Sequence, residues 1–331
     1  MKAKKLISVL ALALAATTFS ACGDQSVTFG HYWFKDSLTK EENFFEQAEY
    51  IISSKSAESS YANYEVSYEG TFVTTLEYSA TEDIYTFSTK LDVKATFKVG
   101  ETEQTVDDSA ESQVKIDASS NALRPISSSK KMYCHTPISG TFDSADKCYV
   151  IVDYEYSTAH GTDKDAGDFT MSKCEITNNA GEKFETTLTD TFDFVKNYTF
   201  MDNEQILVAT RAFAPDTTSA TLSTYSAFAK GTQKVKFSFT DAEENATEAF
   251  HYTLVSADGT ENSAARNILC RTAKINLDQK NPGATQTIKF AKTTDAGDND
   301  YRNVILEITA PLAYSMGEIY YKLNKVSYKK N

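Results

Sequence analysis

A two-residue alternation that runs from Tyr85 to Lys98 limits the fold of this chain more than any other feature. Apolar residues occupy one set of alternate positions: Tyr85, Phe87, Leu91, Val93, Ala95 and Phe97. Charged and hydroxyl-bearing residues stand between them. Because successive side chains of a β-strand point to opposite faces, this pattern predicts a strand with one buried face and one face toward solvent.

Weaker versions of the same alternation recur along the chain. They occur at Tyr68, Phe72, Leu76 and Tyr78, from Val235 to Phe239, and from Glu318 to Lys329. Turn-forming residues at 179–181, 257–259 and 295–297 separate such segments. Alternation with short turns is typical of antiparallel strands that follow one another, so we expect about a dozen strands and no β-α-β units.

Two of the predicted strands are long. The segments from Asp83 to Val99 and from Phe184 to Phe200 exceed the usual strand length of roughly 3–10 residues. A long strand with one apolar face must curl to bury that face. We therefore expect a mainly β fold, in which a large curved antiparallel sheet, half-barrel-like, carries one or two helices. Two β-sandwich domains, with a boundary between Pro215 and Ser226, are the alternative.

Two segments favour helices. Thr39 and Glu42 have the spacing of a capping box, and helical spacing of apolar residues follows as far as Ser54. The apolar positions of this first helix are Phe44, Phe45, Ala48, Ile51 and Ile52. A second, shorter helix is predicted to begin at Asp202, because Gln205 stands three residues later and apolar residues follow.

The first residues have the layout of a secretory signal. A positive start at Lys2, Lys4 and Lys5 is followed by an apolar run too short for a comfortable membrane span. The small residues Ser20 and Ala21 then precede Cys22. The segment Phe19-Ser20-Ala21-Cys22 resembles the lipobox of bacterial lipoproteins, although Phe19 stands where that family usually has Leu. The resemblance implies a signal peptide over 1–21, a diacylated (palmitate-type) Cys22, and an extracytoplasmic protein anchored to a membrane. We expect residues 22–36 to form a tether and residues 37–331 to form the β-rich domain.

The charge of the chain bears on its partners. The formal net charge is −13, and removal of the three signal lysines leaves −13 − 3 = −16. Such a surface repels phosphate backbones, so we expect no nucleic-acid partner. No later stretch of sequence approaches the roughly 18 apolar residues of a membrane-spanning helix.

Four cysteines remain after Cys22, and an exported protein permits disulfides between them. A hairpin centred on Thr141 places Cys134 directly opposite Cys148, at a separation that a disulfide can close. Cys174 and Cys270 then form the second expected pair. Four unpaired thiols are the alternative, and the lack of a Cys-x-x-Cys pair disfavours a zinc site.

The sequence gives little support to catalysis or metal binding. The histidines are His31, His135, His160 and His251, and none stands in a metal-binding or hydrolase motif. Two acidic clusters, at 163–168 and 295–300, lack glycine at the sixth position of a calcium loop and are interpreted as solvated hairpin tips. We therefore expect no enzyme activity, no metal and no cofactor.

Three local stretches, together with the lipobox and the amphipathic strands, resemble the half-barrel group of periplasmic lipoprotein carriers and lipid-binding lipoproteins. The stretches are Leu123-Arg124-Pro125-Ile126, the run from Asp202 to Arg211, and the segment from Leu312 to Leu323. The resemblance implies a curved sheet that wraps around a few helices and holds acyl chains on its concave side. No ligand residue can be transferred from it.

Two functions follow as hypotheses. The first is a non-enzymatic binding or carrier protein for an apolar ligand such as lipid, because many one-faced strands and few helices can leave a concave apolar face to be covered. The second is an adhesion or interaction module of stacked β-sandwiches that binds a protein or a glycan. Two separate hydrophobic cores would favour the second.

Overall fold

The computed structural model describes residues 27–31, 43–56, 64–99, 101–119, 121–137, 145–157, 166–176, 183–195, 197–227, 231–241, 247–277, 285–292, 303–312 and 317–330. The expected signal peptide and Cys22 lie outside these residues. Within them, no helix is long and apolar enough to cross a membrane.

Fifteen strands and one short α-helix make up the described fold. The strands are β1 (Phe44–Ser56), β2 (Tyr64–Ser79), β3 (Ile84–Val99), β4 (Thr102–Asp117), β5 (Pro125–Pro137), β6 (Ala145–Ser157), β7 (Ala166–Ile176), β8 (Lys183–Asp193), β9 (Ser219–Ser226), β10 (Gly231–Asp241), β11 (Thr247–Val255), β12 (Glu261–Asn276), β13 (Thr285–Ala291), β14 (Ile305–Pro311) and β15 (Gly317–Lys330). A 3-10 turn, η2 (Asn203–Gln205), leads into the helix α1 (Ile206–Ala212). The fold is therefore mainly β, as the alternation predicts.

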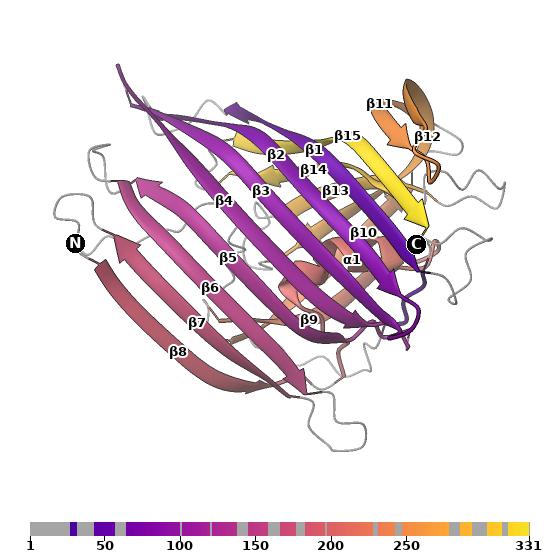
Figure 1. Ribbon diagram of the computed structural model, residues 1–331, viewed down its shortest axis with the longest axis horizontal. Helices are drawn as coiled ribbons and strands as arrows, with labels where there is room; N and C mark the ends of the chain where they lie inside the picture. Colours follow the sequence, from indigo (N-terminus) through magenta and orange to yellow (C-terminus); the bar gives the residue numbers. More distant parts are fainter. Residues whose placement is uncertain are drawn as a thin grey trace.

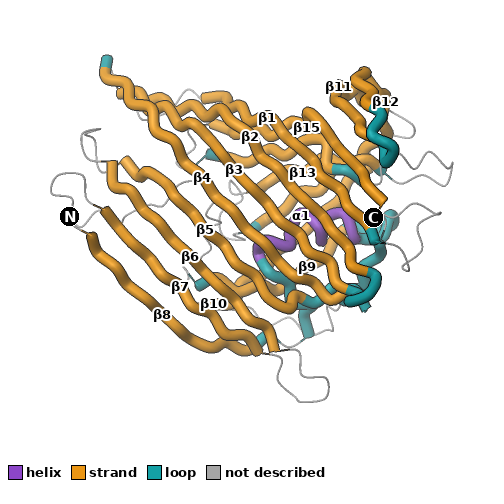
Figure 2. Tube along the Cα trace, viewed as in Figure 1, coloured by secondary structure: helices purple, strands orange, loops and turns teal. Residues whose placement is uncertain are grey.

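All the strands belong to one sheet. Its hydrogen-bonded order is β8-β7-β6-β5-β4-β3-β2-β1-β15-β14-β13-β12-β10-β9, and β11 pairs with both β12 and β15. The β11–β15 pairing is parallel and closes a ring of five strands, β11 to β15. The sheet curves so that β1–β8 form a front layer, with α1 and the later strands behind it (Figures 1 and 2). This confirms the large curved sheet.

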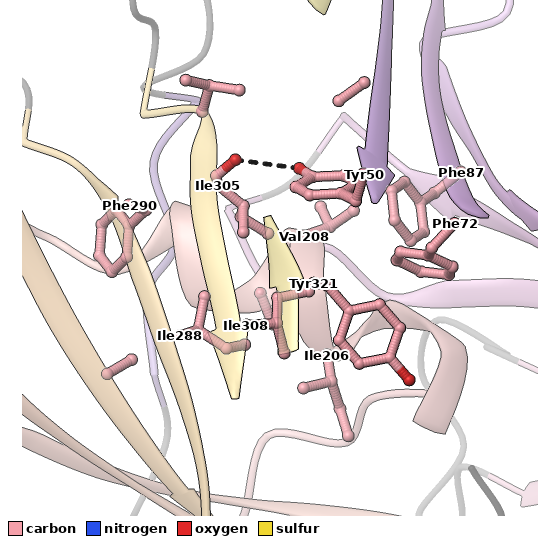
Figure 3. Packing of buried hydrophobic residues seen from close by; sticks show 14 of the residues in the cluster. Tyr50, Phe72, Phe87, Ile206, Val208, Ile288, Phe290, Ile305, Ile308 and Tyr321 are labelled. Carbon is pink, nitrogen blue, oxygen red and sulfur yellow. Dashed lines mark hydrogen bonds between the residues drawn. The ribbon is translucent and has the colours of Figure 1, made fainter. Parts of the chain in front are cut away.

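The alternation positions the core of the sheet. In β3 the residues Tyr85, Phe87, Leu91, Val93, Ala95 and Phe97 are buried, and the charged residues between them are exposed. The inward faces of the two layers meet around α1. Figure 3 shows Ile206 and Val208 of α1 with side chains of β1–β3 and of β13–β14, and the Tyr50 hydroxyl donates a hydrogen bond to the carbonyl of Ile305 at 3.1 Å.

The helix predicted after Thr39 is wrong, because Phe44–Ser56 is strand β1, paired with β2 on one side and β15 on the other. Its inward positions alternate as Phe44, Glu46, Ala48, Tyr50 and Ile52, all buried. The charged residue in this series breaks the apolar alternation, and the remaining apolar residues mimic helical spacing. Pairing on both edges overrides local propensity.

The shorter helix is confirmed. Asp202 is the N-cap of η2, its side chain accepts from the backbone, and the Gln205 side chain reciprocates as in a capping box. The predicted turn at 257–259 also separates β11 from β12, whereas the turns at 179–181 and 295–297 lie outside the described residues.

The segment from Phe184 to Phe200 is not one long strand. Strand β8 ends at Asp193, and Asn197 has a positive φ of 65°, which a continuous strand cannot contain. Phe200 then forms an isolated parallel bridge with Ser223 of β9. The chain therefore leaves the β8 edge and crosses to the opposite end of the sheet.

The two-sandwich alternative is wrong. No boundary separates two sheets between Pro215 and Ser226, because β9 begins at Ser219 and joins the same sheet as the preceding strands through β10 and β12. The larger hydrophobic cluster combines residues of β1–β4 with residues of α1 and β9–β15. A second, smaller cluster combines residues of β5–β8 with Phe200, Tyr225 and Ala227. Both clusters therefore contain residues from before and after the expected boundary, and neither is the core of a separate domain.

Candidate functional site

The N-cap carboxylate of Asp202 connects the helix to the front layer of the sheet. The Ser128 hydroxyl on β5 donates to Oδ2 at 2.5 Å, the Tyr156 hydroxyl on β6 donates to the same oxygen, and the Glu204 backbone N–H donates to Oδ1 at 2.6 Å. Beside this group, Lys130 of β5 forms an ion pair with Glu204 at 2.6 Å. These contacts fix η2 against β5 and β6.

Burial perturbs the ionisation of this group. It raises the pKa of Asp202 above its ordinary value, and the nearby charge of Glu204 adds to the rise, while the bonds from Ser128 and Tyr156 oppose it. Burial and the Asp202 charge likewise raise the pKa of Tyr156 well above its ordinary value. Each polar group is thus occupied by its neighbours, which is typical of a structural anchor.

A second buried polar contact holds the other end of the helix. Arg211 at the end of α1 donates from both terminal nitrogens to the two carboxylate oxygens of Glu46 on β1, at 2.6 and 2.8 Å. The side chains are only 4% and 2% exposed. Burial lowers the pKa of Arg211, but the attraction of Glu46 outweighs it and the net shift is upward. A charge-assisted, bidentate pair of this kind is strong only while both partners are present.

Next to the Asp202 contacts, and sharing Tyr156 with them, lies a cluster of aromatic rings that we call the aromatic seam. Its members are Tyr154, Tyr156, Phe169, Phe192, Phe194, Phe200 and Tyr225. The Phe192 and Tyr225 rings stack with centroids 3.8 Å apart, and the Phe194 and Phe200 rings do the same. Most of these residues are buried, whereas Tyr154 and Phe194 are half-buried and form the rim.

The seam lies where the two ends of the sheet approach each other. Strands β8 and β9 terminate the hydrogen-bonded order, and among the described residues no ladder pairs them. Phe192 of β8 reaches Tyr225 of β9 by ring stacking instead. Gly167 on β7 permits this position of the ring, since a Cβ there would lie 2.5 Å from Cζ of Phe192. The sheet is thus closed at this point by side chains.

The crossing segment after β8 covers the edge of β9. The Ser223 N–H donates to the Thr199 carbonyl and the Met201 N–H donates to the Ser223 carbonyl, both at 2.9 Å. The side chain of Phe200 enters the seam from this segment. The seam is therefore bounded by β6–β8, by the crossing segment and by the end of β9.

Part of the expected tether belongs to the fold. The backbone N–H of Val27 donates to Oγ1 of Thr199 at 2.7 Å. Phe29 is buried in the main core, and its ring meets that of Phe213 at 5.1 Å. Nδ1 of His31 lies 2.6 Å from the Tyr85 hydroxyl. Residues 27–31 are therefore packed against the fold, although the sequence led us to expect a tether as far as 36.

The predicted hairpin places two cysteines opposite each other. Cys134 of β5 and Cys148 of β6 are direct cross-strand partners, as the centre at Thr141 requires. Their thiols lie outside the part of the structure that is described, so the disulfide stays a prediction. Cys270 is a free buried thiol, and burial raises its pKa to about 12. The expected pairing of Cys174 with Cys270 is thus not formed, because the first lies on β7 and the second on β12, in distant parts of the sheet order.

We expect the Cys134–Cys148 disulfide to form in exported protein. Opposed strand residues have β-carbons about 4.5–5.5 Å apart, and a disulfide needs about 3.8 Å. The bond closes a short loop and is expected to add about 2–4 kcal/mol to the free energy of unfolding relative to a Cys134→Ser, Cys148→Ser protein. Peptide mass spectrometry without reduction measures it directly. Alkylation of both cysteines in unreduced, denatured protein would contradict the prediction.

The remaining polar candidates do not converge. His251 is exposed on β11, and the side chains of His135 and His160 lie outside the described residues. So does most of the two acidic clusters, although Asp168 is exposed on β7. Among the residues that the structure describes, no three His, Cys, Asp or Glu side chains form a group suited to a metal ion. Of these candidates, His251 and Asp168 have described side chains, and neither is a member of the aromatic seam.

The comparisons with known proteins give little to transfer. No protein-family model matches the chain, and no curated protein matches it. A crystal structure from Brucella abortus, described as a beta-barrel-like protein of domain of unknown function DUF1849, is similar with a TM-score of 0.44 and 11% sequence identity. The match covers 86% of this chain and 97% of that chain.

Proposed function

We propose that this protein is a non-enzymatic, lipid-anchored protein outside the cytoplasm that binds an apolar ligand, such as lipid, at the aromatic seam. The observation that carries the proposal is the closure of the sheet there by stacked rings in place of a hydrogen-bonded ladder. Elsewhere in the sheet order, neighbouring strands are joined by backbone hydrogen bonds. At the seam, β8 and β9 can move apart without breaking a ladder of backbone hydrogen bonds between them.

The energetics of the seam favour an apolar occupant. A ring pair contributes about 0.5–1.5 kcal/mol beyond the burial of its area, and separation of the rings also exposes apolar surface. An acyl chain that enters between Phe192 and Tyr225 covers that surface again and contributes about 0.8 kcal/mol for each buried methylene. Water does not offset the cost of separating the rings, because the exposed apolar surface stays uncovered. Separation is therefore favourable only when an apolar ligand enters.

The half-buried rim gives the ligand a route. Phe194 and Tyr154 are partly accessible, and the Tyr154 hydroxyl accepts a hydrogen bond from the backbone N–H of Ala227 at 3.0 Å. A rim ring with a polar end suits the boundary between a ligand's apolar chain and its headgroup. The net charge favours a zwitterionic or neutral headgroup over an anionic one.

The proposed location depends on Cys22. The lipobox-like residues before it support export and acylation, and two acyl chains hold a protein on a membrane durably. The adhesion hypothesis depended on a boundary between two sandwiches, and the single continuous sheet removes that support.

Native mass spectrometry of the chain expressed from Gly23 onward, incubated with phosphatidylethanolamine, tests the proposal. We expect a one-to-one lipid adduct. Phe194→Gln is expected to weaken the binding at least tenfold, because it places an amide on the apolar rim. Phe250→Gln is the matched control, since Phe250 is also half-buried but lies on β11, away from the seam. No adduct, or equal losses for the two variants, would overturn the proposed site.

A further inference from the structure

We infer that the N-terminal anchor holds the aromatic seam toward the membrane, so that the bound ligand is a lipid exchanged directly with the bilayer. This inference deepens the proposed function and rests on it. It is carried by an observation that the proposal does not use, namely the point at which the N-terminal segment meets the fold.

The N-terminal segment joins the fold at the crossing segment of the seam. Both backbone groups of Val27 contact the Thr199 hydroxyl, with the N–H donating at 2.7 Å and the carbonyl accepting at 3.4 Å. Thr199 directly precedes Phe200, whose ring lies in the seam. Two residues after Val27, the Phe29 side chain is buried in the main core. The N–H of Gly30 donates a hydrogen bond to the Ala212 carbonyl at 2.8 Å. The entry point of the chain is thus attached to the wall of the seam.

The distance from the anchor to this point is short. Val27 is the fifth residue after Cys22, and a fully extended chain spans at most about 3.3–3.6 Å for each residue step. Val27 therefore lies within about 18 Å of the acylated cysteine. The longest strands have 16 residues and measure roughly 53 Å at about 3.3 Å for each residue.

A tether of this length restricts the orientation of the domain. It is about a third as long as the strands of the front layer, so the protein cannot turn freely and bring any surface to the bilayer. The surface near Thr199 stays closest to the membrane, and the β11–β12 hairpin lies on the far side of the molecule from the lower ends of β8 and β9 (Figure 1). A lipid that leaves the bilayer therefore meets the Phe194 rim first.

Tryptophan quenching by brominated phosphatidylcholine tests the orientation in the full, acylated protein on vesicles. The chain contains one tryptophan, so Trp33→Phe provides a silent background. In that background, Phe194→Trp reports on the seam rim, and His251→Trp reports on an exposed position of β11. We expect brominated lipid to reduce the Phe194→Trp emission at least twofold relative to unbrominated lipid and to leave the His251→Trp emission unchanged.

Several outcomes separate the inference from the proposed function. Quenching of His251→Trp but not of Phe194→Trp, or of neither, overturns the orientation. So does the absence of acyl chains on Cys22 in the purified protein. If the soluble chain binds phosphatidylethanolamine while Phe194→Trp is not quenched, the proposed function stands and the inference fails. Quenching at Phe194→Trp without a lipid adduct in the soluble chain supports the orientation and contradicts lipid binding.

Discussion

Replacement of Glu46 by alanine is expected to lower the free energy of unfolding by about 3–5 kcal/mol. The substitution leaves the Arg211 guanidinium, only 4% exposed, without its bidentate carboxylate partner. An uncompensated charge in the protein interior loses its hydration without an attraction that offsets the loss. Urea unfolding followed by circular dichroism measures the change.

Two controls distinguish the charge effect from a loss of packing. The double substitution Glu46→Leu, Arg211→Met is expected to be far milder than Glu46→Ala alone, because it removes both charges and keeps apolar volume. On the surface, Asp92→Ala removes the partner of Lys90, a pair with more than half of each side chain exposed, and is expected to cost about 0–1 kcal/mol. Equal costs for Glu46→Ala and Asp92→Ala would show that the buried pair does not hold α1 to β1.

Replacement of Phe192 by alanine is expected to cost about 3–5 kcal/mol, the usual range for truncation of a buried aromatic ring. The ring stacks on Tyr225 and contacts Phe200 and Tyr156, so its removal opens a cavity between β8 and β9. The same chemical unfolding measurement applies, with Phe45→Ala on the partly exposed face of β1 as the comparison. A cost below about 1 kcal/mol would mean that the stack is not a closing contact.

A second substitution tests the geometry of that contact. Gly167→Ala forces the Phe192 ring to move, because the new Cβ would lie 2.5 Å from Cζ, and we expect a cost of about 1–3 kcal/mol. In the Phe192→Ala background the obstructing ring is absent, so the same glycine substitution is expected to be nearly neutral. Additive costs in this cycle would contradict the contact, because residues that touch are expected to couple.

The sequence was informative where local pattern and tertiary environment agree. The β3 alternation predicts its own burial, because both neighbouring strands face the same core. The capping box at Asp202 predicts η2 and α1, since a cap depends on residues within one turn. The hairpin count places Cys134 opposite Cys148 for the same local reason.

The sequence was misleading where a residue distant in the chain determines the environment of a side chain. Glu46 lies on an inward position of β1 only because Arg211, 165 residues later, neutralises it. In the sequence alone, a glutamate indicates an exposed position. The two-residue alternation of β1 is therefore not recognisable as that of a strand with one buried face. Ser128 and Tyr156 likewise gain their roles through contacts with Asp202 that no sequence spacing reveals. The capping-box spacing predicts Gln205, but not the hydrogen bond that its side chain donates to the Leu123 carbonyl.

The aromatic seam could not be predicted from the sequence either. Phe and Tyr are frequent throughout the chain, and ordinary strand packing explains most of them. The signal that distinguishes the seam is the meeting of β8 with β9, the two ends of the hydrogen-bonded order. The positive φ at Asn197, which turns the chain toward β9, could be suspected from the residue type but not from the alternation around it.

Photo-crosslinking with a phosphatidylethanolamine that carries a diazirine in its acyl chain tests lipid binding at the seam most directly. We expect label on peptides that contain Tyr154, Phe169, Phe194 and Tyr225. Excess unmodified lipid should remove this label, and Phe194→Gln but not Phe250→Gln should reduce it. Label confined to the outer faces of the strands or to the β11–β12 hairpin, or label that excess lipid does not displace, would contradict lipid binding at the seam.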